Sequence, residues 1–437
     1  MNYFILYFLI FIIWINVYIL YSYSSNKDDC APIDDIGVFW ITIFALYSTL
    51  PVFSWILQGY TYISPLRPRL LEIQPDITDI NYLLLIATSY AISFTIVFKF
   101  FRKKIKKLEI NNFKKIPQPI LVSSFVIVII TNLFIYFSGQ LFGIQSAESY
   151  IDQYRVIQQA PLLVRQLLKY LLSFQSISII IILTSFIQNW KKYKIYFYLF
   201  VLFTLFNFNI EGGRASLGVT ILSIFFLWHV TMKKISSKIW IACSIIGLSI
   251  FLILGVLRGT QNLSNYDLTG DSTPGVGEFD AIWGNALHLN EQKQAGNLSV
   301  PFTVRFEEFW DFIPSQLLFF NKRSLSVWYL DTYYPKYKEQ GGGWAFGTLS
   351  QAIIGFGPFE AFIRGGVLAL LYGYLMSWYR KSKNNWWALP FYLNIYLYSF
   401  MSIRDTTFTQ LSTVITSLLP ALLLIYTIRY ILISNKS

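Results

Sequence analysis

The sequence predicts an all-α, polytopic integral membrane protein with about 11 transmembrane helices and one large extracytoplasmic loop. Composition is the first reason: 55% of the 437 residues are hydrophobic and 13% are charged, whereas soluble domains carry about 25% charged residues. The second reason is that apolar runs of about 18 residues or more recur, each long enough to cross the hydrocarbon core. The third is that these runs are continuous, unlike the short alternating segments of a membrane β-barrel.

We interpret the apolar runs as spans in chain order. The first has no basic residue before it and no A-x-A site after it, which indicates a retained span rather than a cleaved signal. The second contains Pro51, which leaves open whether that helix is broken. Residues 346–360 are less regularly apolar and precede the ninth span. The expected spans are residues 3–21, 36–58, 80–101, 119–138, 167–188, 195–210, 214–230, 239–257, 361–379, 386–403 and 407–432.

The long runs divide the chain into three parts. Residues 1–257 are expected to form an N-terminal transmembrane bundle of about eight helices. Residues 258–345 form the large extracytoplasmic loop, in which we expect short helices. Residues 346–437 form a C-terminal transmembrane part, with a re-entrant segment followed by about three helices. Glycines and a proline at 355–358 are expected to break the helix there, so this segment has to be buried or to line a cavity.

Basic residues predict the orientation. The net charge of +12 does not indicate a nucleic-acid partner, because the lysines cluster in short segments between apolar runs, as they do in cytoplasmic loops. The most basic segment is 102–118, and counting spans forward from it places the later clusters at 190–194, 231–238 and 380–385 on the same side. Counting backward places the acidic segment 22–35 inside and the N-terminus outside, a mild conflict because acidic residues contribute little to orientation.

The large loop carries aromatic residues at a density that disordered segments avoid. A loop this long in a compact protein is usually functional or disordered, so we favour function. Its candidate catalytic groups are Glu278, Asp280 and His288, because a general base has to be a carboxylate or a histidine near the reacting hydroxyl. The alternative is an ordered cap whose carboxylates are surface charge and whose aromatic residues form its own core.

Three arginines stand at the extracytoplasmic ends of predicted spans: Arg214, Arg258 and Arg404. Charges at membrane depth are costly and usually face the protein interior or a wet cavity, and a guanidinium fork suits a diphosphate. Together the three arginines predict an anionic-ligand site, in which Arg214 and Arg258 are candidate catalytic residues and Arg404 and Glu211 are candidates for substrate binding. The alternative is that each arginine is a helix-end anchor, or, for Arg214, an interfacial arginine that pairs with Glu211.

Other arginines are weaker candidates for substrate binding. Arg155 and Arg165 lie in the outer segment 139–166, where a solvated helix face explains them as well. Arg323 adds positive charge within the large loop. Arg364 follows Glu360 by four residues, a spacing that favours a structural ion pair on one helix face.

No metal or cofactor site is predicted. The sequence contains no P-loop, no G-x-G-x-x-G, no H-E-x-x-H and no G-x-S-x-G motif, so a nucleotide-driven pump is not supported. The two cysteines, Cys30 and Cys243, are far apart, one in a polar loop and the other inside an apolar run. This arrangement provides neither a disulfide framework nor a zinc pattern.

The pattern resembles the Wzy-type O-antigen and oligosaccharide repeat-unit polymerases of bacterial envelopes. The features that carry the resemblance are the turn Asn209-Ile210-Glu211-Gly212-Gly213-Arg214-Ala215-Ser216, the span ending Gly255-Val256-Leu257-Arg258-Gly259, the single large outer loop, the stretch Gly355-Phe356-Gly357 and the late Arg404. It covers most of the chain at the level of architecture and short motifs.

The resemblance implies a metal-independent glycosyltransferase in the bacterial cytoplasmic (inner) membrane, with its active face outside the cytoplasm. Undecaprenyl-diphosphate-linked oligosaccharide would be both donor and acceptor, membrane lipid the surrounding partner, and a chain-length regulator protein a further partner. The growing glycan would move to the non-reducing end of an incoming lipid-linked repeat. An O-antigen ligase and a lipid-linked oligosaccharide flippase remain alternatives, although a flippase does not need a large structured loop and usually carries charges deep in many spans.

Overall fold

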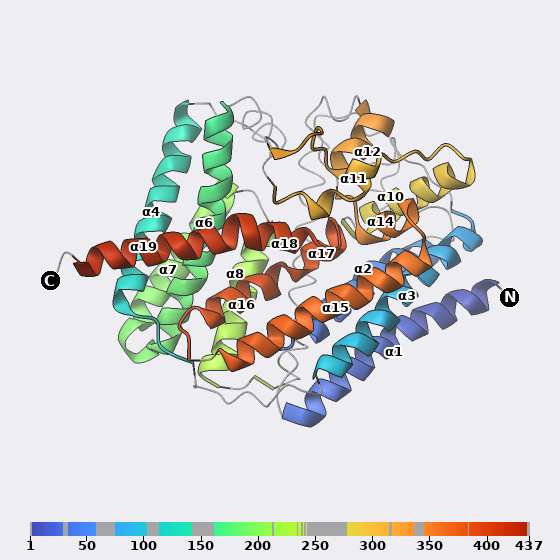
Figure 1. The fold of residues 1–437 in the computed structure, drawn as a ribbon. Helices are drawn as coiled ribbons and strands as arrows, with labels where there is room; N and C mark the ends of the chain where they lie inside the picture. Colours follow the sequence, from blue (N-terminus) through green and yellow to red (C-terminus); the bar gives the residue numbers. More distant parts are fainter. Residues whose placement is uncertain are drawn as a thin grey trace.

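The computed structural model is helical throughout the residues that it describes, without a β-strand among them, which confirms the all-α class for this part of the chain (Figure 1). The described residues are 2–28, 34–57, 75–102, 113–141, 161–211, 214–233, 235–236, 239, 242, 278–313, 317–335, 345–382 and 384–434.

Seven candidate spans in the described part of the chain are long and apolar enough to cross a membrane. They lie in α1 (Asn2–Asp28), α2 (Ile36–Leu57), α3 (Ile77–Arg102), α4 (Gln118–Leu141), α6 (Leu162–Gln188), α15 (Pro358–Lys381) and the continuous run of α18 (Thr409–Thr413), the π-helix η6 (Val414–Leu418) and α19 (Leu419–Ser434).

The predicted total of about 11 spans is therefore not confirmed. Two further predicted spans are helices, α7 (Trp190–Glu211) and α8 (Arg214–Thr231), and the latter contributes a shorter apolar stretch. A third, 386–403, is helical in three consecutive pieces: α16 (Ala388–Leu397), η5 (Tyr398–Phe400) and α17 (Met401–Arg404). The predicted span 239–257 lies almost entirely outside the described residues.

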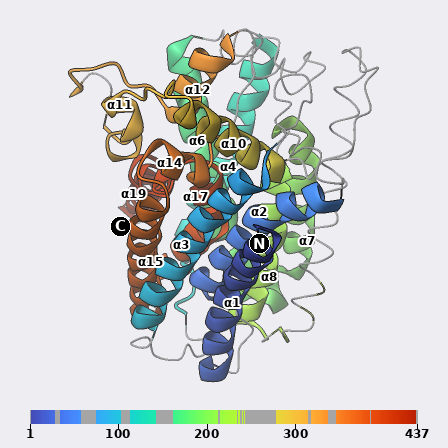
Figure 2. The ribbon, with the colours of Figure 1, turned by 90° about the vertical axis from the view of Figure 1, so that its right-hand side faces the viewer.

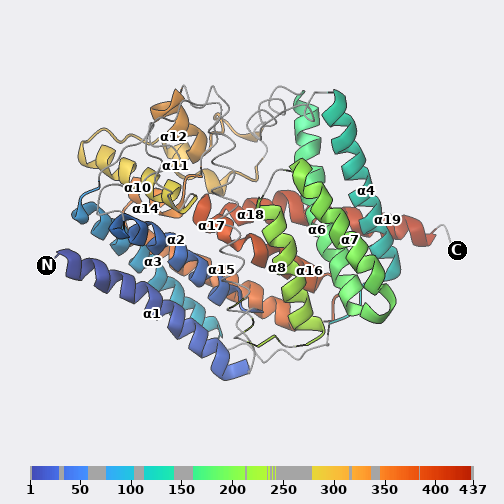
Figure 3. The ribbon, with the colours of Figure 1, turned by 180° about the vertical axis from the view of Figure 1, so that it is seen from behind.

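The long helices pack in two groups that are linked by the C-terminal elements (Figures 1 and 3). Helices α1, α2, α3 and α15 contact one another, and α6 packs against α4, α7 and α8. Helix α16 contacts α15 in the first group and α6 and α8 in the second, while α19 packs on α4 and α6. The C-terminal part thus joins the bundle formed by the N-terminal part.

Contacts between helix ends gather the predicted basic segments at one end of the bundle, here called the basic end. Arg380, at the end of α15, forms a buried ion pair of 3.0 Å with Asp34, just before α2. Phe113 stacks on Tyr379 at 5.2 Å, and the N–H of Ile116 donates to the side chain of Gln188. The described residues of segments 22–35, 102–118 and 380–385 therefore meet at one end of the bundle, as the span count requires.

The N-terminal helices also alternate in direction between the two ends of the bundle. The amide of Asn81 donates to the carbonyl of Asn2 at 3.0 Å, while the Lys99 ammonium lies 5.6 Å from the centre of the Tyr23 ring. Helices α1 and α3 are therefore parallel, and α2 returns between them. This arrangement agrees with the backward count, which puts the N-terminus at the end opposite the acidic segment.

Helices α3 and α15 also run parallel and approach closely because glycines line their contact. A Cβ at Gly365 would lie 2.4 Å from the Ser93 hydroxyl oxygen and 2.6 Å from the Tyr90 carbonyl oxygen, and one at Gly373 would lie 2.7 Å from the Phe101 Cβ. Small residues that let helix backbones meet are typical of packing inside membranes.

The described part of the large loop lies at the opposite end, here called the loop end (Figure 2). It forms α10 (Glu278–Gln294), α11 (Phe302–Arg305), η3 (Glu307–Phe309) and α12 (Leu325–Tyr333). The predicted re-entrant segment 346–360 is a short buried helix, α14 (Thr348–Ile354), followed by a turn and the start of α15. The break at the glycines is confirmed: Gly357 has a φ of 63°, which favours glycine.

Pro51 does not break α2, which continues to Leu57. Proline has no N–H to donate to the carbonyl four residues earlier, which here belongs to Tyr47. The Trp283 indole of α10 donates to that carbonyl at 3.0 Å. Because of the proline, the Tyr47 carbonyl of α2 can accept a hydrogen bond from the loop residue Trp283.

The glycine contact makes a matched prediction. Gly365→Ala should lower the melting temperature of the purified protein, because the new Cβ meets the backbone of α3 and overpacking costs about 1–3 kcal/mol. Gly366→Ala should leave it unchanged or raise it, because the nearest atom to its Cβ is 3.7 Å away and alanine favours helix by up to about 1 kcal/mol. Equal effects at both positions would contradict this account of the interface.

Candidate functional site

A cavity of about 240 Å³ lies where the loop helices meet the turn between α17 and α18. Four carboxylates and several hydroxyl groups converge on it from three chain segments that are far apart in sequence. The cavity is lined by Glu307, Glu308, Asp311, Ser324, Ser326, Phe346, Asp405, Thr406 and Thr409. It can therefore offer many hydrogen-bond acceptors to a polar, uncharged ligand.

Glu307 has a strongly shifted pKa. Burial, together with the charges of Asp311, Glu308 and Asp405, raises the pKa of Glu307 to about 8, although the N–H of Leu325 lowers it. That N–H donates to Glu307 Oε2 at 2.6 Å. A carboxylate with a pKa near working pH is suited to proton transfer.

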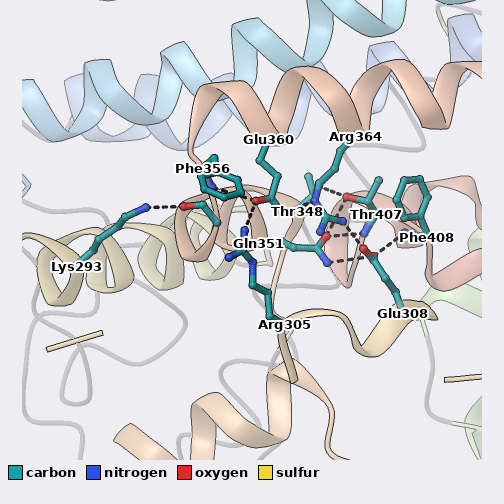
Figure 4. Close-up of polar contacts among 11 residues, drawn as sticks. Lys293, Arg305, Glu308, Thr348, Gln351, Phe356, Glu360, Arg364, Thr407 and Phe408 are labelled. Carbon is teal, nitrogen blue, oxygen red and sulfur yellow. Dashed lines mark hydrogen bonds and ion pairs between the residues drawn. The ribbon is translucent and has the colours of Figure 1, made fainter. Parts of the chain in front are cut away.

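Glu308, the next residue, points into a buried polar network behind the cavity (Figure 4). Its side chain is fully buried and forms an ion pair with Arg364 of α15. Its second oxygen accepts from the Gln351 amide at 3.0 Å and from the N–H of Phe408 at 3.2 Å. One carboxylate thus joins η3 to α14, α15 and the turn before α18.

Arg364 is held on its other side by Glu360 at 2.8 Å. The sequence-predicted ion pair is thereby confirmed. Glu360 Oε2 also accepts from Arg305 at 3.0 Å and from the N–H of Phe356 at 3.0 Å. The carboxyl group fills the space beside Gly355, where an added Cβ would lie 1.5 Å from it. The two arginines and two glutamates sum to no net charge.

Gln351 fixes the turn that carries Asp405 and Thr406. Its side-chain oxygen accepts from both the N–H and the hydroxyl of Thr407, each at 3.0 Å. The Thr407 hydroxyl also lies 2.8 Å from that of Thr348. These contacts hold the cavity-lining turn against the start of α14.

Lys293 reaches the same region from α10. Its ammonium donates to the carbonyls of Ile353 and Gly355 at 2.6 and 2.8 Å, at the C-terminus of α14, where positive charge is favourable. Burial lowers the pKa of Lys293, and the nearby Arg305 lowers it further. The loop is therefore attached to the break before α15 by two of its helices.

His288 lies apart from the cavity, in the aromatic core of the loop. Its Nδ1 is 2.8 Å from the Tyr329 hydroxyl, and the rings of Tyr333 and Tyr334 pack against it at 4.8 and 5.8 Å. Burial lowers the pKa of His288 to about 4. These contacts give His288 a packing role in the loop core, and its catalytic role stays a prediction. The carboxylates that line the cavity are further candidates for the general base.

Two of the predicted arginines directly precede cavity-lining residues along the chain. Arg404 ends α17 and is followed by Asp405 and Thr406, and Arg323 is followed by Ser324. Arg323 pairs with Asp331 within the loop, at the partly exposed start of α12. The substrate-binding roles of Arg404, Arg323 and the buried Arg364 stay predictions.

For the remaining candidate site residues, the structure describes either the backbone position only or nothing. Glu211 ends α7 and Arg214 begins α8, so these two helices do follow each other across a short connection. Arg165 lies in the first turn of α6, and Glu278 and Asp280 lie in the first turn of α10. Arg155 and Arg258 lie outside the described residues.

Comparison with known proteins adds no relative: no family model, no curated protein and no solved structure matches this chain. The site therefore rests on its own geometry. Sequence reasoning gave no role to Glu307, Glu308 or Asp311. Their short spacing among aromatic residues is a weak local signal, since the partners at Gln351 and Phe408 are distant in sequence.

The buried network predicts a strong dependence on pairing. Arg364→Met should destabilise the protein by about 3–5 kcal/mol, because the buried Glu308 carboxylate loses its ion-pair partner, while Glu360 keeps Arg305. Adding Glu308→Gln should recover part of that loss, because the uncompensated charge is removed. Arg323→Met breaks a partly exposed pair as a control and should cost about 1 kcal/mol or less. Equal melting-temperature losses for the two arginine variants would contradict this assignment.

The position of His288 predicts acid sensitivity of the loop. Because its pKa is about 4 in the fold and about 6.5 when unfolded, the unfolded state binds more protons between these values. Stability is therefore complete above about pH 6.5 and falls as the pH approaches 4, by roughly 3 kcal/mol. Hydrogen exchange of α10 and α12 should show this loss in the wild type, whereas His288→Gln should lack that pH dependence. An unchanged pH profile in the variant would assign the effect elsewhere.

Proposed function

We propose that this chain is a membrane glycosyltransferase that polymerises undecaprenyl-diphosphate-linked oligosaccharide repeat units. The growing glycan would be transferred to the non-reducing end of an incoming lipid-linked repeat, on the extracytoplasmic face of the bacterial cytoplasmic membrane. The observation that supports this best is the carboxylate and hydroxyl cavity at the loop end of a bundle of membrane-spanning helices. Such a lining suits sugar hydroxyls, which both donate and accept hydrogen bonds.

The lining of the cavity suits the acceptor better than the donor. It includes no lysine or arginine, so a diphosphate would find no cationic partner there, whereas a neutral sugar needs none. The donor diphosphate would instead lie with the predicted arginines, of which Arg404 adjoins the cavity turn. Guanidinium groups would stabilise the charge that develops on the leaving diphosphate.

In this proposal Glu307 is the proton acceptor. Its carboxylate takes the proton of the acceptor hydroxyl as that oxygen attacks the anomeric carbon of the donor glycan. The bond from that carbon to the lipid diphosphate breaks, and the diphosphate leaves with the electron pair. Asp311 and Asp405 orient the acceptor, a contribution that lowers the barrier without covalent chemistry.

The direct test is to supply the purified protein, in lipid, with lipid-linked repeat units and no nucleotide sugar or ATP. Longer lipid-linked chains are expected. Transfer of glycan to a different acceptor, without chain growth, would favour a ligase. No covalent product together with movement of the lipid across the bilayer would favour a flippase, and either result would overturn the polymerase proposal.

Glu307→Gln should lower the polymerisation rate by about 100-fold to 10,000-fold, the usual contribution of a general base. In the wild type the rate should rise with pH and level off above about pH 8, because burial raises the pKa of Glu307 to about 8 and only the ionised form accepts a proton. Glu291→Gln changes an exposed carboxylate on α10 and should leave rate and profile unchanged. A Glu307→Gln enzyme with the wild-type pH profile would exclude Glu307 as the base.

A further inference from the structure

Residues 302–313 and 317–320, here called the aromatic segment, expose large apolar side chains although they lie outside the spanning helices. Phe302 and Leu317 are each 70% exposed, and Phe319 is fully exposed, with Phe309 and Phe312 also exposed. Contiguous apolar patches of this kind are unusual on a surface that faces water and mark interaction sites.

This patch continues the lipid-facing surface of the bundle. Phe356, in the turn before α15, and Phe359, in its first turn, are 71% and 67% exposed, and α15 is long and apolar enough to cross a membrane. The Arg305 guanidinium of α11 lies 4.9 Å from the centre of the Phe356 ring. Figure 2 shows α11 beyond the loop ends of α15 and the C-terminal helices.

A second contact joins the patch to the neighbouring spanning run. The ring of Phe309 packs 6.0 Å from that of Phe408, directly before α18, where Leu411 and Ile415 are exposed. The segment therefore lies over the loop ends of two spanning helices whose exposed faces are apolar. Aromatic side chains gather at this level in membrane proteins, where the hydrocarbon meets the headgroups.

Two large polar side chains of the segment, those of Arg305 and Trp310, have partners inside the protein. Arg305 bonds Glu360 rather than pointing outward, and the Trp310 indole donates to the carbonyl of Thr303 at 2.8 Å. Successive turns pair the N–H groups of Val304, Arg305, Phe306, Phe309, Trp310 and Ile313 with nearby carbonyls. Backbone groups have to be hydrogen-bonded within the protein in this way where little water is present.

We propose that residues 302–313 and 317–320 form an interfacial element that inserts its aromatic side chains into the leaflet at the loop end. The occupant of the patch is lipid. The insertion places Glu307 and Asp311, which lie within the same segment, at the level of the headgroups, where the diphosphate of a lipid-linked substrate also lies. The proposal concerns membrane contact and holds whether or not the chain is a polymerase.

Depth measurements on single nitroxide labels test the proposal without an activity assay. Cys30 and Cys243 are the only cysteines, so replacing both by Ala gives a background for Phe302→Cys, Phe319→Cys and Leu317→Cys. Each labelled protein is placed in phospholipid nanodiscs, and its collision rates with oxygen and with a water-soluble nickel chelate are compared. Thr332→Cys, exposed on α12, is the aqueous control, and Leu370→Cys, exposed on α15, is the lipid-facing control.

The expected result is an oxygen-to-nickel ratio at positions 302, 317 and 319 that is several-fold above the Thr332 control and approaches the Leu370 control. Ratios equal to the Thr332 control at all three positions would overturn the proposal. In that case the patch faces water in the isolated protein and is available to a protein partner. Melting temperatures close to that of the cysteine-free background confirm that each labelled variant is folded.

Discussion

The buried ion pair between Glu308 and Arg364 is the interaction on which the loop end depends. Burying an ion pair gains little net stability, because desolvation offsets the attraction, but leaving either charge unpaired is costly. Glu308 also accepts from Gln351 and from the N–H of Phe408. Any shift of η3 would leave these donors without their acceptor, so the loop has one position relative to α14, α15 and the turn before α18. Glu307 directly precedes Glu308 in η3, so the contacts of Glu308 also fix where Glu307 lies.

Two other features make this docking possible, and both depend on what a residue lacks. Pro51 lacks an N–H, so the Tyr47 carbonyl accepts from Trp283 of α10. Gly365 lacks a side chain, so α15 meets the backbone of α3 and brings Glu360 and Arg364 close to the ends of α2 and α3. The scaffold for the polar network is thus set by close apolar packing, which in membranes relies on small residues more than on hydrophobic driving force.

Sequence reasoning reached the helical class and the sharing of one end by the basic segments, because apolar length and lysine placement are local signals. It reached the Glu360–Arg364 pair for the same reason: four residues on a helix are a local distance. It could not place Glu308, whose partners Gln351, Arg364 and Phe408 are brought together only by the fold. His288 was a candidate by residue type, and only its surrounding tyrosines show that it is buried in a core.

The lining of the cavity is the strongest constraint on any ligand. Carboxylates and hydroxyl groups line it, and nearby charges are paired: Glu308 and Glu360 with Arg364, Glu360 also with Arg305, and Asp311 with Lys322. The lining residues include no lysine or arginine, so an anion would find no cationic partner there, but a polyol would find hydrogen-bond acceptors. Under the membrane contact proposed above, an anionic lipid group would remain at the rim while the sugar attached to it reached inward. The two proposals together imply a substrate with a lipid, then an anionic group, then a neutral polar chain.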